Sequence, residues 1–506
     1  MNSKLSKNSQ IWLHTALWIY ALILIGFNFI RLFDNVFWID EAYYAIWHAA
    51  LPWGKLIRIL LHDDIQQPFY YLLLKCFMVV LGRHGWVYHF VSFLPCLILI
   101  PFSLTLFKKS FGLFAGLLLA TFIGLSPAAV HYNVEVRMYS WAMLWMALAF
   151  YGFYLVLQDC RKGWPLLVAG AIFGGYTHIY CLPAIGILFI WLFISCCKKH
   201  RIGIWVLASL CTLAASFPWL YFFIGRSLTY ARESWQTWAM VPNLARALNY
   251  IFTGGLAYDW YWHVGLLLAI AVFAALAKGL CQLLTHGEDE KDFTTLRLLA
   301  AGLVCVAGTW LAGYAVSWFL KPLLIKRYLF PVSIIGWMTI AIAPSFFKYG
   351  RMISLGLLGI LLLCFVPEDW RMYERESMIA EICDQTLALL DKEITPKDVL
   401  VTFGVNAHLY YTSHYYFPDN LILSYDKYNT EIPYSDMHLD NLSPETTYYI
   451  LTTSTWLADG EPLDMEKLRG NIAKDGFECL EIVKDGYIGD YRTDVYKVTR
   501  KKEQGK

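Results

Sequence analysis

The stretch IWLHTALWIYALILIGFNFI, residues 11–30, decides the fold class of this chain. As a helix it is long enough to cross a bilayer, because roughly 20 apolar residues span about 30 Å of hydrocarbon. It is too long for the core of a signal peptide, and no small-residue cleavage site follows it. We therefore expect it to remain attached as a membrane-spanning helix.

Apolar runs of similar length recur along the chain up to residue 366. They cover residues 86–107, 111–130, 139–157, 202–224, 263–284, 296–320 and 328–346, with a shorter run at 352–366. Residues 164–197 would be about 51 Å long as one helix, so we expect them to fold back near Gly174, Gly175 and Pro183. The sequence thus predicts about 11 transmembrane helices. Residues 69–81 are too few for a span, so we expect re-entrant helices in the first outer loop, residues 33–85.

The charge pattern divides the chain in two and predicts its orientation. Only 16% of the residues are charged, against roughly 25% in soluble domains. The net charge of +2 is the difference between about +13 in residues 1–366 and about −11 in residues 367–506. The basic short turns (Lys108, Lys109, Arg161, Lys162, Lys198, Lys199, Arg201, Lys348 and Arg351) all face inward if the N-terminus is cytoplasmic. We expect a multi-pass protein of the cell inner (plasma) membrane with an extracytoplasmic C-terminal domain.

The C-terminal part, residues 367–506, has the pattern of a small α/β soluble domain. Residues 378–390 have helical spacing, residues 398–403 and 447–453 are predicted strands, and residues 482–498 alternate like a hairpin. No glycine-rich phosphate loop, metal spacing or nucleophile elbow occurs in this sequence. The predicted organisation is a transmembrane domain at 1–366 and a binding or docking domain at 367–506.

Two adjacent carboxylates, Asp40 and Glu41, lie in the aromatic segment WIDEAYY, residues 38–44, of the first outer loop. A carboxylate at a membrane surface is costly unless it is paired or used. One interpretation is a general base that accepts the proton of an attacking hydroxyl. The alternative is an acid that caps the following helix or extends to the interface. Capping explains one acid more easily than both.

Two further outer segments carry charges close to apolar runs. The segment HDDIQQP, residues 62–68, holds Asp63 and Asp64, which could orient a substrate, a cation or a backbone amide. Glu135 and Arg137 lie between the third and fourth predicted crossings. Their spacing does not place them on one helix face, so each is expected to have its own partner. The planar guanidinium of Arg137 suits a phosphate, either of a substrate or of an ordinary lipid.

The last two candidate sites follow later crossings. Lys326 and Arg327 are consecutive cations before an aromatic residue at a helix start. They could hold a phosphate or diphosphate, or they could anchor the helix at the interface. His178 lies at an outer helix end in the segment GGYTHIY, residues 174–180. A lone histidine is more often structural than a ligand.

Taken in order, these segments resemble the bacterial membrane glycosyltransferases of the GT-C class, related to dolichyl-phosphate-mannose protein mannosyltransferases and lipid A aminoarabinose transferases. WIDEAY at 38–43 resembles the family's W-x-D-E-A-Y, and VEVRMY at 134–139 resembles Q-E-A-R-M-Y. DIQQPFYYLL at 64–73 resembles D-x-H-P-P-L-Y-Y-L-L but has glutamines where His-Pro is common. His178 falls where many members have T-H-Y, and Arg327-Tyr328 matches a later R-Y.

The resemblance implies a helical fold with an outer cavity and a sugar donor carried on a polyprenyl phosphate. It implies that Asp40, beside Glu41, matches the catalytic base, and that the reaction inverts the anomeric carbon. It also implies that Arg137 and Arg327, with Lys326, hold the leaving lipid phosphate, whose charge grows as the bond breaks. Asp64, Glu135 and His178 complete the predicted substrate-binding set.

Several matters stay open at the level of sequence. The acceptor could be an envelope lipid, a glycan or a protein, and the sugar is not specified. No metal ligand and no cofactor is assigned, although Asp63, Asp64, Glu41 or Glu135 could hold a divalent cation. Partners are expected to be the lipid-linked donor, the acceptor and membrane lipids, with no nucleic acid. The alternatives are a transporter or flippase of lipid-linked glycans, for which inverted repeats are expected, and a membrane scaffold for the C-terminal domain.

Overall fold

The computed structural model describes residues 7–34, 36–63, 66–233, 237–255, 262–286, 290–403, 408–425, 446–453, 465–474 and 476–501. The chain forms two compact units. The membrane unit comprises Met1–Phe33 and Leu51–Arg371, and the tail unit comprises Asp34–Ala50 and Met372–Lys506. The first outer loop is thus divided, because Asp34–Ala50 packs with the C-terminal part. The organisation predicted from the sequence instead assigned these residues to the transmembrane domain.

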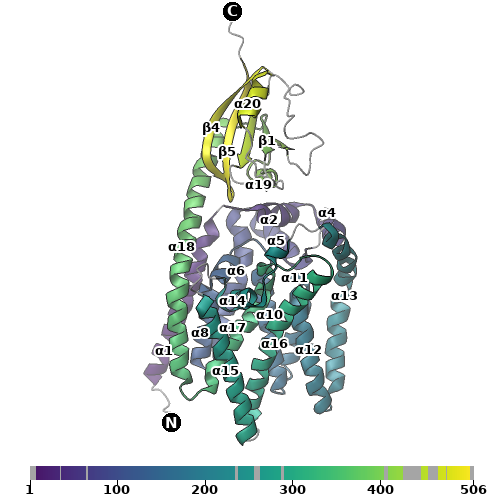
Figure 1. Cartoon of the computed structure of the whole chain (residues 1–506), viewed down its shortest axis with the longest axis vertical. Helices are drawn as coiled ribbons and strands as arrows, with labels where there is room; N and C mark the ends of the chain where they lie inside the picture. Colours follow the sequence, from purple (N-terminus) through teal and green to yellow (C-terminus); the bar gives the residue numbers. More distant parts are fainter. Residues whose placement is uncertain are drawn as a thin grey trace, which may run out of the picture. The chain divides into compact units, whose positions relative to one another are not determined.

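Nine of the described helices are long and apolar enough to cross a membrane. They are α1 (Lys7–Phe29), α6 (Gly85–Phe102), α10 (Tyr139–Leu157), α12 (Cys181–Lys198), α13 (Ile202–Glu233), α15 (Trp262–His286), α16 (Glu290–Phe319), α17 (Phe330–Ile342) and α18 (Gly350–Glu393). α17 reaches the length of a span only with the short turns on both sides of it, as the continuous segment Lys326–Phe346. In the membrane unit these helices lie side by side in one bundle (Figure 1). Together with the sheet of the tail unit, this confirms the predicted fold class.

The remaining two predicted crossings are shorter helices. Residues 111–130 form α8 (Leu113–Leu125) and α9 (Pro127–Tyr132), with Ser126 between them. Residues 164–197 do fold back, but the break lies between α11 (Gly163–Thr177) and α12 rather than at Gly174, Gly175 or Pro183. Gly174 and Gly175 are buried and stay helical within α11. A helix can begin with a proline in its first turn, so Pro183 does not break α12.

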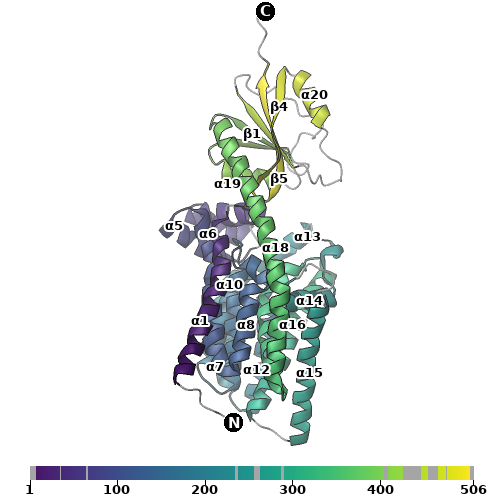
Figure 2. The same ribbon diagram turned by 90° about the vertical axis from the view of Figure 1, so that its left-hand side faces the viewer.

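Short helices occupy the ends of the bundle. The predicted re-entrant segment is α5 (Pro68–Leu81), which lies at the end of the bundle away from the start of α1 (Figure 2). α4 (Trp53–Arg58) lies at the same end (Figure 1). The other short elements of this unit are η1 (Ile30–Phe33), η3 (Ile59–Asp63), η4 (Ser103–Phe107), α7 (Lys108–Phe111), η5 (Trp238–Met240), α14 (Leu244–Thr253), η7 (Lys326–Leu329) and η8 (Ala343–Phe346).

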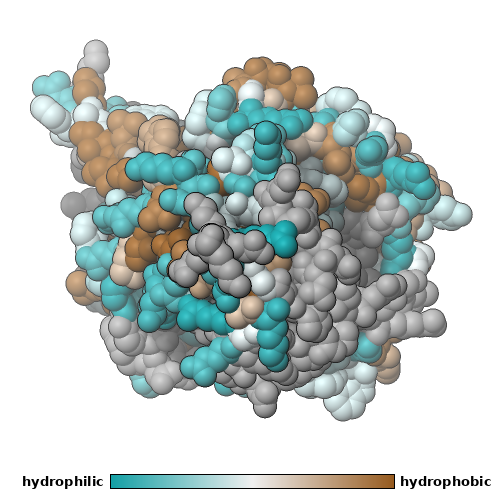
Figure 3. Space-filling view, turned by 90° about the horizontal axis from the view of Figure 1, so that it is seen from above, coloured by the Kyte–Doolittle hydropathy of each residue, from teal (hydrophilic) through white to brown (hydrophobic). Residues whose placement is uncertain are grey.

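Large apolar side chains cover the outside of several of these helices. Trp12 and Leu22 on α1, Phe217 on α13 and Leu284 on α15 are all more than 60% exposed in the isolated chain. Such contiguous apolar surface is unfavourable in water and is what a lipid environment covers. The face drawn in Figure 3 instead mixes many hydrophilic residues with the apolar ones.

Glycines bring α10 and α11 into close contact. A Cβ atom on Gly152 would lie 2.6 Å from the backbone nitrogen of Leu167, and one on Gly170 would lie 2.6 Å from the carbonyl of Trp145. Small residues of this kind let membrane helices approach through their backbones. The two helices are antiparallel neighbours, so the start of α10 and the end of α11 lie at the same end of the bundle.

A buried polar network joins α1 to the α8–α9 turn. Asn133 donates from Nδ2 to Asn28 Oδ1 and to the carbonyl of Ile123, each at 3.0 Å. Asn28 donates to the carbonyl of Gly124 at 2.9 Å, and Arg31 donates to the carbonyl of Val130 at 3.1 Å. Buried polar groups are tolerated in such an apolar bundle only when they are hydrogen-bonded. The network fixes the start of the segment that leads to Arg137.

The tail unit contains a mixed five-stranded sheet with the order β2-β1-β3-β5-β4. Its strands are β1 (Val399–Phe403), β2 (Leu421–Tyr425), β3 (Tyr448–Thr453), β4 (Phe477–Ile488) and β5 (Tyr491–Arg500). β1 pairs in parallel with β2 and β3, whereas β3–β5 and β5–β4 are antiparallel. The observed β1, β3 and β4–β5 hairpin correspond to the strands predicted at 398–403, 447–453 and 482–498.

Both faces of this sheet are covered, because successive side chains of a strand point to opposite faces and β1 is buried at every position. Val399, Val401 and Phe403 point to the face covered by α20 (Met465–Lys474). Leu400 points to the other face, which packs on Leu390 of α18 and on α19 (His408–Tyr416). The helix predicted at 378–390 is the last part of α18, which continues through Pro367.

Candidate functional site

Arg137 is positioned by hydrogen bonds between its own segment and α6. His89 Nδ1 lies 2.7 Å from the carbonyl of Val134, and Ser140 and Trp141 donate to carbonyls of α6 at 2.6 and 2.8 Å. Arg137 itself is 3% exposed and lies directly before α10. The segment is therefore rigidly attached on both sides of a buried guanidinium.

Glu135 is buried beside the same helix start. Its side chain is 3% exposed, and its Oε1 lies 3.9 Å from Nε2 of His131, at the end of α9. The backbone between α9 and α10, which carries Glu135 and Arg137, is not helical. Both charges lie within the membrane unit, where an isolated charge is expensive.

His178 lies between the end of α11 and the start of α12, and its ring is 2% exposed. Its Nδ1 accepts a hydrogen bond of 3.3 Å from the backbone nitrogen of Tyr180. Burial, together with the positive charges of Arg137 and Arg327, lowers the pKa of His178 to about 3. The imidazole is therefore neutral, and with Nδ1 as acceptor its Nε2 is the N–H donor.

Arg327 reaches the same place from η7, the turn before α17. Arg327 and Arg137 both lower the pKa of His178, although the two arginines are 190 residues apart in the sequence. The guanidinium carbon of Arg327 also lies 5.9 Å from the ring centre of Tyr328. Lys326 is on the same turn but is exposed. The structure therefore brings together Arg137, His178 and Arg327 from three separate connections.

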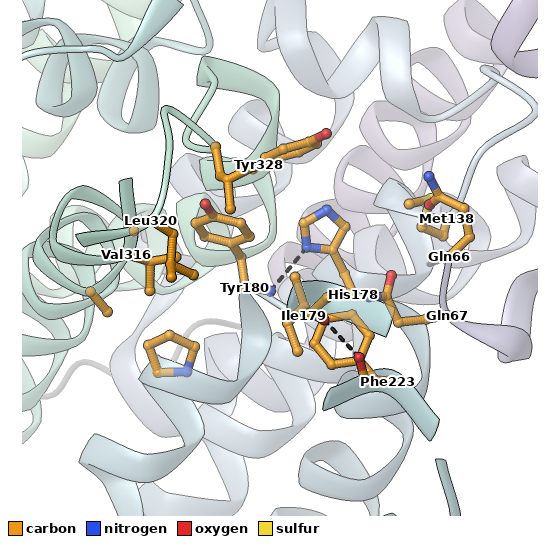
Figure 4. A pocket seen from close by; sticks show the side chains of 15 residues that line it. Gln66, Gln67, Met138, His178, Ile179, Tyr180, Phe223, Val316, Leu320 and Tyr328 are labelled. Atoms are coloured by element: carbon orange, nitrogen blue, oxygen red, sulfur yellow. Dashed lines mark hydrogen bonds between the residues drawn. The ribbon is translucent and has the colours of Figure 1, made fainter. Parts of the chain in front are cut away.

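An apolar pocket of about 280 Å³ lies against this cluster (Figure 4). The rings of His178, Tyr180 and Tyr328 form one wall, with centres 5.4–5.9 Å apart. The other lining residues are Gln66, Gln67, Met138, Ile179, Pro183, Phe223, Ser227, Ala312, Gly313, Val316, Leu320 and Leu323. Met138 and Tyr328 are the sequence neighbours of the two arginines. The pocket thus has apolar walls and the neutral ring of His178, and the two arginines lie next to its lining in sequence rather than among its lining residues.

Gly313 on α16 makes room for the aromatic wall. A Cβ atom on this glycine would lie 2.7 Å from Cε1 of Tyr180 and 2.9 Å from a methyl group of Leu324. Contacts this short do not occur between real side chains without a shift of one of them. The glycine therefore lets the Tyr180 ring lie flat against α16.

Asp40 and Glu41 belong to the tail unit and form the short helix α2 (Ile39–Glu41), which leads into η2 (Ala42–Trp47) and α3 (His48–Ala50). Glu41 is 4% exposed, and its carboxylate accepts the backbone N–H of Trp38 at 3.3 Å. This contact belongs to a capping box at the start of α2, whereas Glu41 makes no side-chain cap to the helix that begins at Ala42. Asp40 is half-buried, so its carboxylate is the more accessible of the pair.

Two tyrosines of the C-terminal part hold the backbone of this segment. The Tyr416 hydroxyl accepts the N–H of Phe37, and the Tyr491 hydroxyl accepts the N–H of Ile39, each at 3.2 Å. Burial raises the pKa of Tyr491, and the charges of Asp490, Asp40 and Glu41 add to the rise. The hydroxyl therefore stays protonated and acts as a fixed acceptor for Ile39.

Close packing adds to these hydrogen bonds. Gly489 has a positive φ of 61°, and a Cβ atom there would lie 2.2 Å from the carbonyl oxygen of Phe37. The Phe37 ring is fully buried and lies 4.8 Å from that of Tyr415. The Tyr43 ring contacts Tyr411 in the same way, with centres 3.8 Å apart. The Asp40 segment is thus built into the tail unit.

The second outer segment is only partly described. Asp64 and the side chain of Asp63 lie outside the described residues, so the structure does not place these two carboxylates. Gln66 and Gln67, which stand where the resembling family has His-Pro, line the pocket beside Met138 and His178. Among the described residues, no group of three or more His, Cys, Asp or Glu side chains could hold a metal ion.

Some pocket residues did not stand out in the sequence. Tyr180 and Tyr328 lie beside His178 and Arg327, so they could have been included from their positions in those two motifs. Phe223, Val316 and Leu320 come from helices that look uniformly apolar in sequence. No local signal separates a pocket-lining residue of such a helix from one that faces lipid.

No family model and no curated protein matches the sequence, but solved structures match the fold. A crystal structure of ArnT from Cupriavidus metallidurans in the apo state covers 97% of this chain and 98% of its own, with a TM-score of 0.54 and 11% identity. A second, of ArnT from the same organism bound to undecaprenyl phosphate, covers 96% and 98%, with a TM-score of 0.52 and 12% identity. The chain therefore has the fold of these ArnT structures, a helical membrane fold as the sequence resemblance implies.

Proposed function

We propose that this protein transfers a sugar from a polyprenyl-phosphate donor to an acceptor hydroxyl at the outer face of the membrane. The observation that carries the proposal is the convergence of Arg137 and Arg327 on His178 at the end of an apolar pocket. A lipid-linked sugar has the complementary features, a phosphate next to an apolar chain. Two arginines can bind a phosphate through charge-assisted hydrogen bonds.

The chemistry we propose is a single in-line displacement. Asp40 accepts the proton of the acceptor hydroxyl, the hydroxyl oxygen attacks the anomeric carbon, and the bond from that carbon to the phosphate oxygen breaks. The leaving group is the polyprenyl phosphate, and the configuration at the anomeric carbon inverts. Arg137 and Arg327 stabilise the charge that develops on the phosphate, and Lys326 adds a third cation.

Other members of the site take supporting roles. The neutral His178 can donate its Nε2–H to a phosphate oxygen without a change of charge. The rings of Tyr180 and Tyr328 offer faces for the sugar or the first isoprene units. Glu135 and Asp64 are proposed to contact the substrate, and Glu41 to support Asp40 through the backbone of their short helix. A structural neighbour, ArnT, is bound to undecaprenyl phosphate, which supports this class of donor.

The first test measures donor binding. Full-length protein in detergent is titrated with undecaprenyl phosphate and bound lipid is measured by native mass spectrometry. We expect Arg137→Gln and Arg327→Gln to weaken binding about tenfold each, because a hydrogen bond to a charged group contributes about 1.5–3 kcal/mol. Lys348→Gln, an exposed cation of the short turn before α18, is the matched control and should bind like wild type. Equal binding by all four proteins would contradict the phosphate role.

The second test measures transfer. Envelope lipids and glycans of a deletion strain are compared by mass spectrometry after complementation with wild type, Asp40→Asn or Lys348→Gln. We expect one sugar modification to be lost on deletion and restored by wild type and Lys348→Gln only. Removal of a general base typically costs 10²–10⁴-fold in rate. Full restoration by Asp40→Asn would exclude this residue as the base. A change in lipid location without a change in lipid structure would indicate a transporter.

A further inference from the structure

A second, strongly basic pocket lies at the other end of α10. It has a volume of about 440 Å³ and is formed by the ends of α10 and α12 and the beginnings of α11, α13 and α16. Its charged lining residues are Asp159, Arg161, Lys199, Arg201 and Arg297, which give a net charge of +3. Because α10 has 19 residues, its length of about 28 Å at 1.5 Å per residue separates this pocket from the His178 cluster.

Asp159 organises two of these cations without neutralising the pocket. Its carboxylate oxygens lie 2.8 Å from Lys199 Nζ and 2.8 Å from Arg201. The backbone of Asp159 has a positive φ of 55°, which an aspartate adopts in tight turns. One carboxylate shared by two cations leaves one positive charge uncompensated. Both basic side chains are therefore held in place next to the cavity.

Arg297 supplies the deepest positive charge of this pocket. It is half-buried on α16, donates a hydrogen bond to the Ser195 hydroxyl and lies 5.5 Å from the ring centre of Phe293. Within the part of the chain that the structure describes, neither Arg297 nor Arg161 has a carboxylate within 4.0 Å. A half-buried cation with only a neutral hydroxyl partner favours an anionic ligand.

The rest of the lining is apolar. Val156, Leu157, Trp164, Leu192 and Ile204 complete the wall. A soluble anion would contact only the basic residues. A phospholipid would use both surfaces, with its head group on the basic residues and its acyl chains on the apolar ones. Basic pockets between transmembrane helices on the cytoplasmic side are a known physical basis for holding anionic lipid head groups. The predicted orientation places this end of the bundle in the inner leaflet.

We propose that this pocket binds the phosphate group of an anionic phospholipid, with the acyl chains against the apolar wall. Arg297 and Arg161 contact the phosphate, and the Lys199–Asp159–Arg201 cluster adds the remaining positive charge. Such a lipid would contact the ends of five helices at once. The site is separate from the donor pocket and does not depend on the proposed transfer reaction.

The test counts bound lipid on the full-length protein. Delipidated protein in neutral detergent is titrated with phosphatidylglycerol or phosphatidylcholine and analysed by native mass spectrometry. We expect phosphatidylglycerol to bind wild type about tenfold more tightly than it binds the Arg161→Gln/Arg297→Gln double variant. Lys348→Gln, the control outside the pocket, should equal wild type. Equal binding by the double variant, or equal binding of the two lipids, would overturn the proposal.

Two further measurements keep the result interpretable. The unfolding temperature of the double variant without lipid shows whether it is folded, and the exposed Arg161→Gln variant replaces it if it is not. Inorganic phosphate is added as a competitor. Failure of phosphate to displace phosphatidylglycerol supports a lipid site. Displacement at concentrations comparable to those of the lipid would identify a soluble anion site and overturn the lipid assignment.

Discussion

At the scale of single residues, the membrane unit contains charges that its apolar surroundings make costly. Glu135 and Arg137 are almost fully buried, and His178 is held neutral beside two arginines. A membrane protein that only needed to span the bilayer would gain stability from apolar residues at these positions. Under the proposed function, Arg137 and His178 would be retained for their contacts with the lipid phosphate.

The lowered pKa of His178 makes stability depend on pH in a defined direction. The folded pKa of about 3 lies below the unfolded value near 6.5, so the unfolded chain binds the proton first. The contribution of His178 to the free energy of unfolding is therefore complete above pH 6.5. It declines as the pH falls toward 3, by up to about 1.4 kcal/mol per pH unit. We expect the unfolding temperature of wild type in detergent to fall more steeply from pH 7 to pH 4 than that of His178→Gln.

The same carboxylates titrate in wild type and in His178→Gln. The difference between the two unfolding temperatures therefore reports the effect of His178 alone. Light-scattering-corrected tryptophan fluorescence in matched buffers gives the two midpoints at each pH. Parallel curves for wild type and His178→Gln would show that the ring does not change its proton affinity on folding.

At the scale of elements, backbone contacts between helices position the site. α10 and α11 approach through Gly152 and Gly170, and this contact aligns the helix ends that carry Arg137 and His178. Hydrophobic periodicity cannot supply this alignment, because both helices are apolar all round. Small residues at specific positions supply it instead.

Gly152→Ala tests this contact. The new methyl group would lie 2.6 Å from the backbone nitrogen of Leu167, which cannot move like a side chain. We expect a loss of about 1–3 kcal/mol in the free energy of unfolding, as for other overpacked cores. Gly186→Ala on α12 is the matched control, since a Cβ atom there meets nothing within 4 Å. Helix propensity alone should make this control up to about 1 kcal/mol more stable. Equal effects of both changes would exclude the close contact.

The tail unit offers a similar comparison at the Asp40 segment. Gly489→Ala and Gly476→Ala both place a side chain at positive φ, but only the first meets the Phe37 carbonyl. The free energy of unfolding should fall by about 1 kcal/mol in both variants, because alanine is disfavoured at positive φ. The N–H groups of Phe37 and Ile39 donate hydrogen bonds to the hydroxyls of Tyr416 and Tyr491. Only Gly489→Ala should also increase the rate of hydrogen exchange at these two amides. Under the proposed function, it should also lower transfer while donor binding stays unchanged.

Unchanged exchange at Phe37 and Ile39 in Gly489→Ala would show that the segment is held without this contact. Tyr491→Phe provides an independent measurement, because it removes the acceptor of the Ile39 amide and keeps the ring. Protection of Ile39 should then decrease while that of Phe37 is retained.

At the scale of the whole molecule, the distribution of charge predicts which end faces the cytoplasm. The net charges near +13 and −11 belong to residues 1–366 and 367–506, and the basic short turns fall on one side of the predicted topology. We expect alkaline phosphatase fused after residue 501 to be active, and the same enzyme fused after Lys199 to be inactive. The reverse pattern would invert the orientation and place the proposed phospholipid site in the outer leaflet.

Much of the architecture follows from local properties of the sequence. Length and hydrophobicity identified the apolar helices, because the thickness of a bilayer sets the length of any segment that crosses it. Short strand-like runs identified β1 and β3, and alternation of apolar and polar residues identified the β4–β5 hairpin. α19, α20 and β2 were not predicted, since α19 is rich in tyrosine, α20 is short and polar, and β2 is only five residues long. Their stability comes from packing on the sheet.

The candidate residues could also be identified individually, because charges in outer connections stand out against apolar runs. The sequence by itself determined a multispanning helical protein, a polar tail and a set of outer acids and arginines. Only the tertiary structure decided that Arg137, His178 and Arg327 meet, and that Tyr416 and Tyr491 hold the Asp40 segment across 379 and 452 residues of chain. Such contacts depend on how close-packed helices and strands align, and no local pattern in the sequence encodes that alignment.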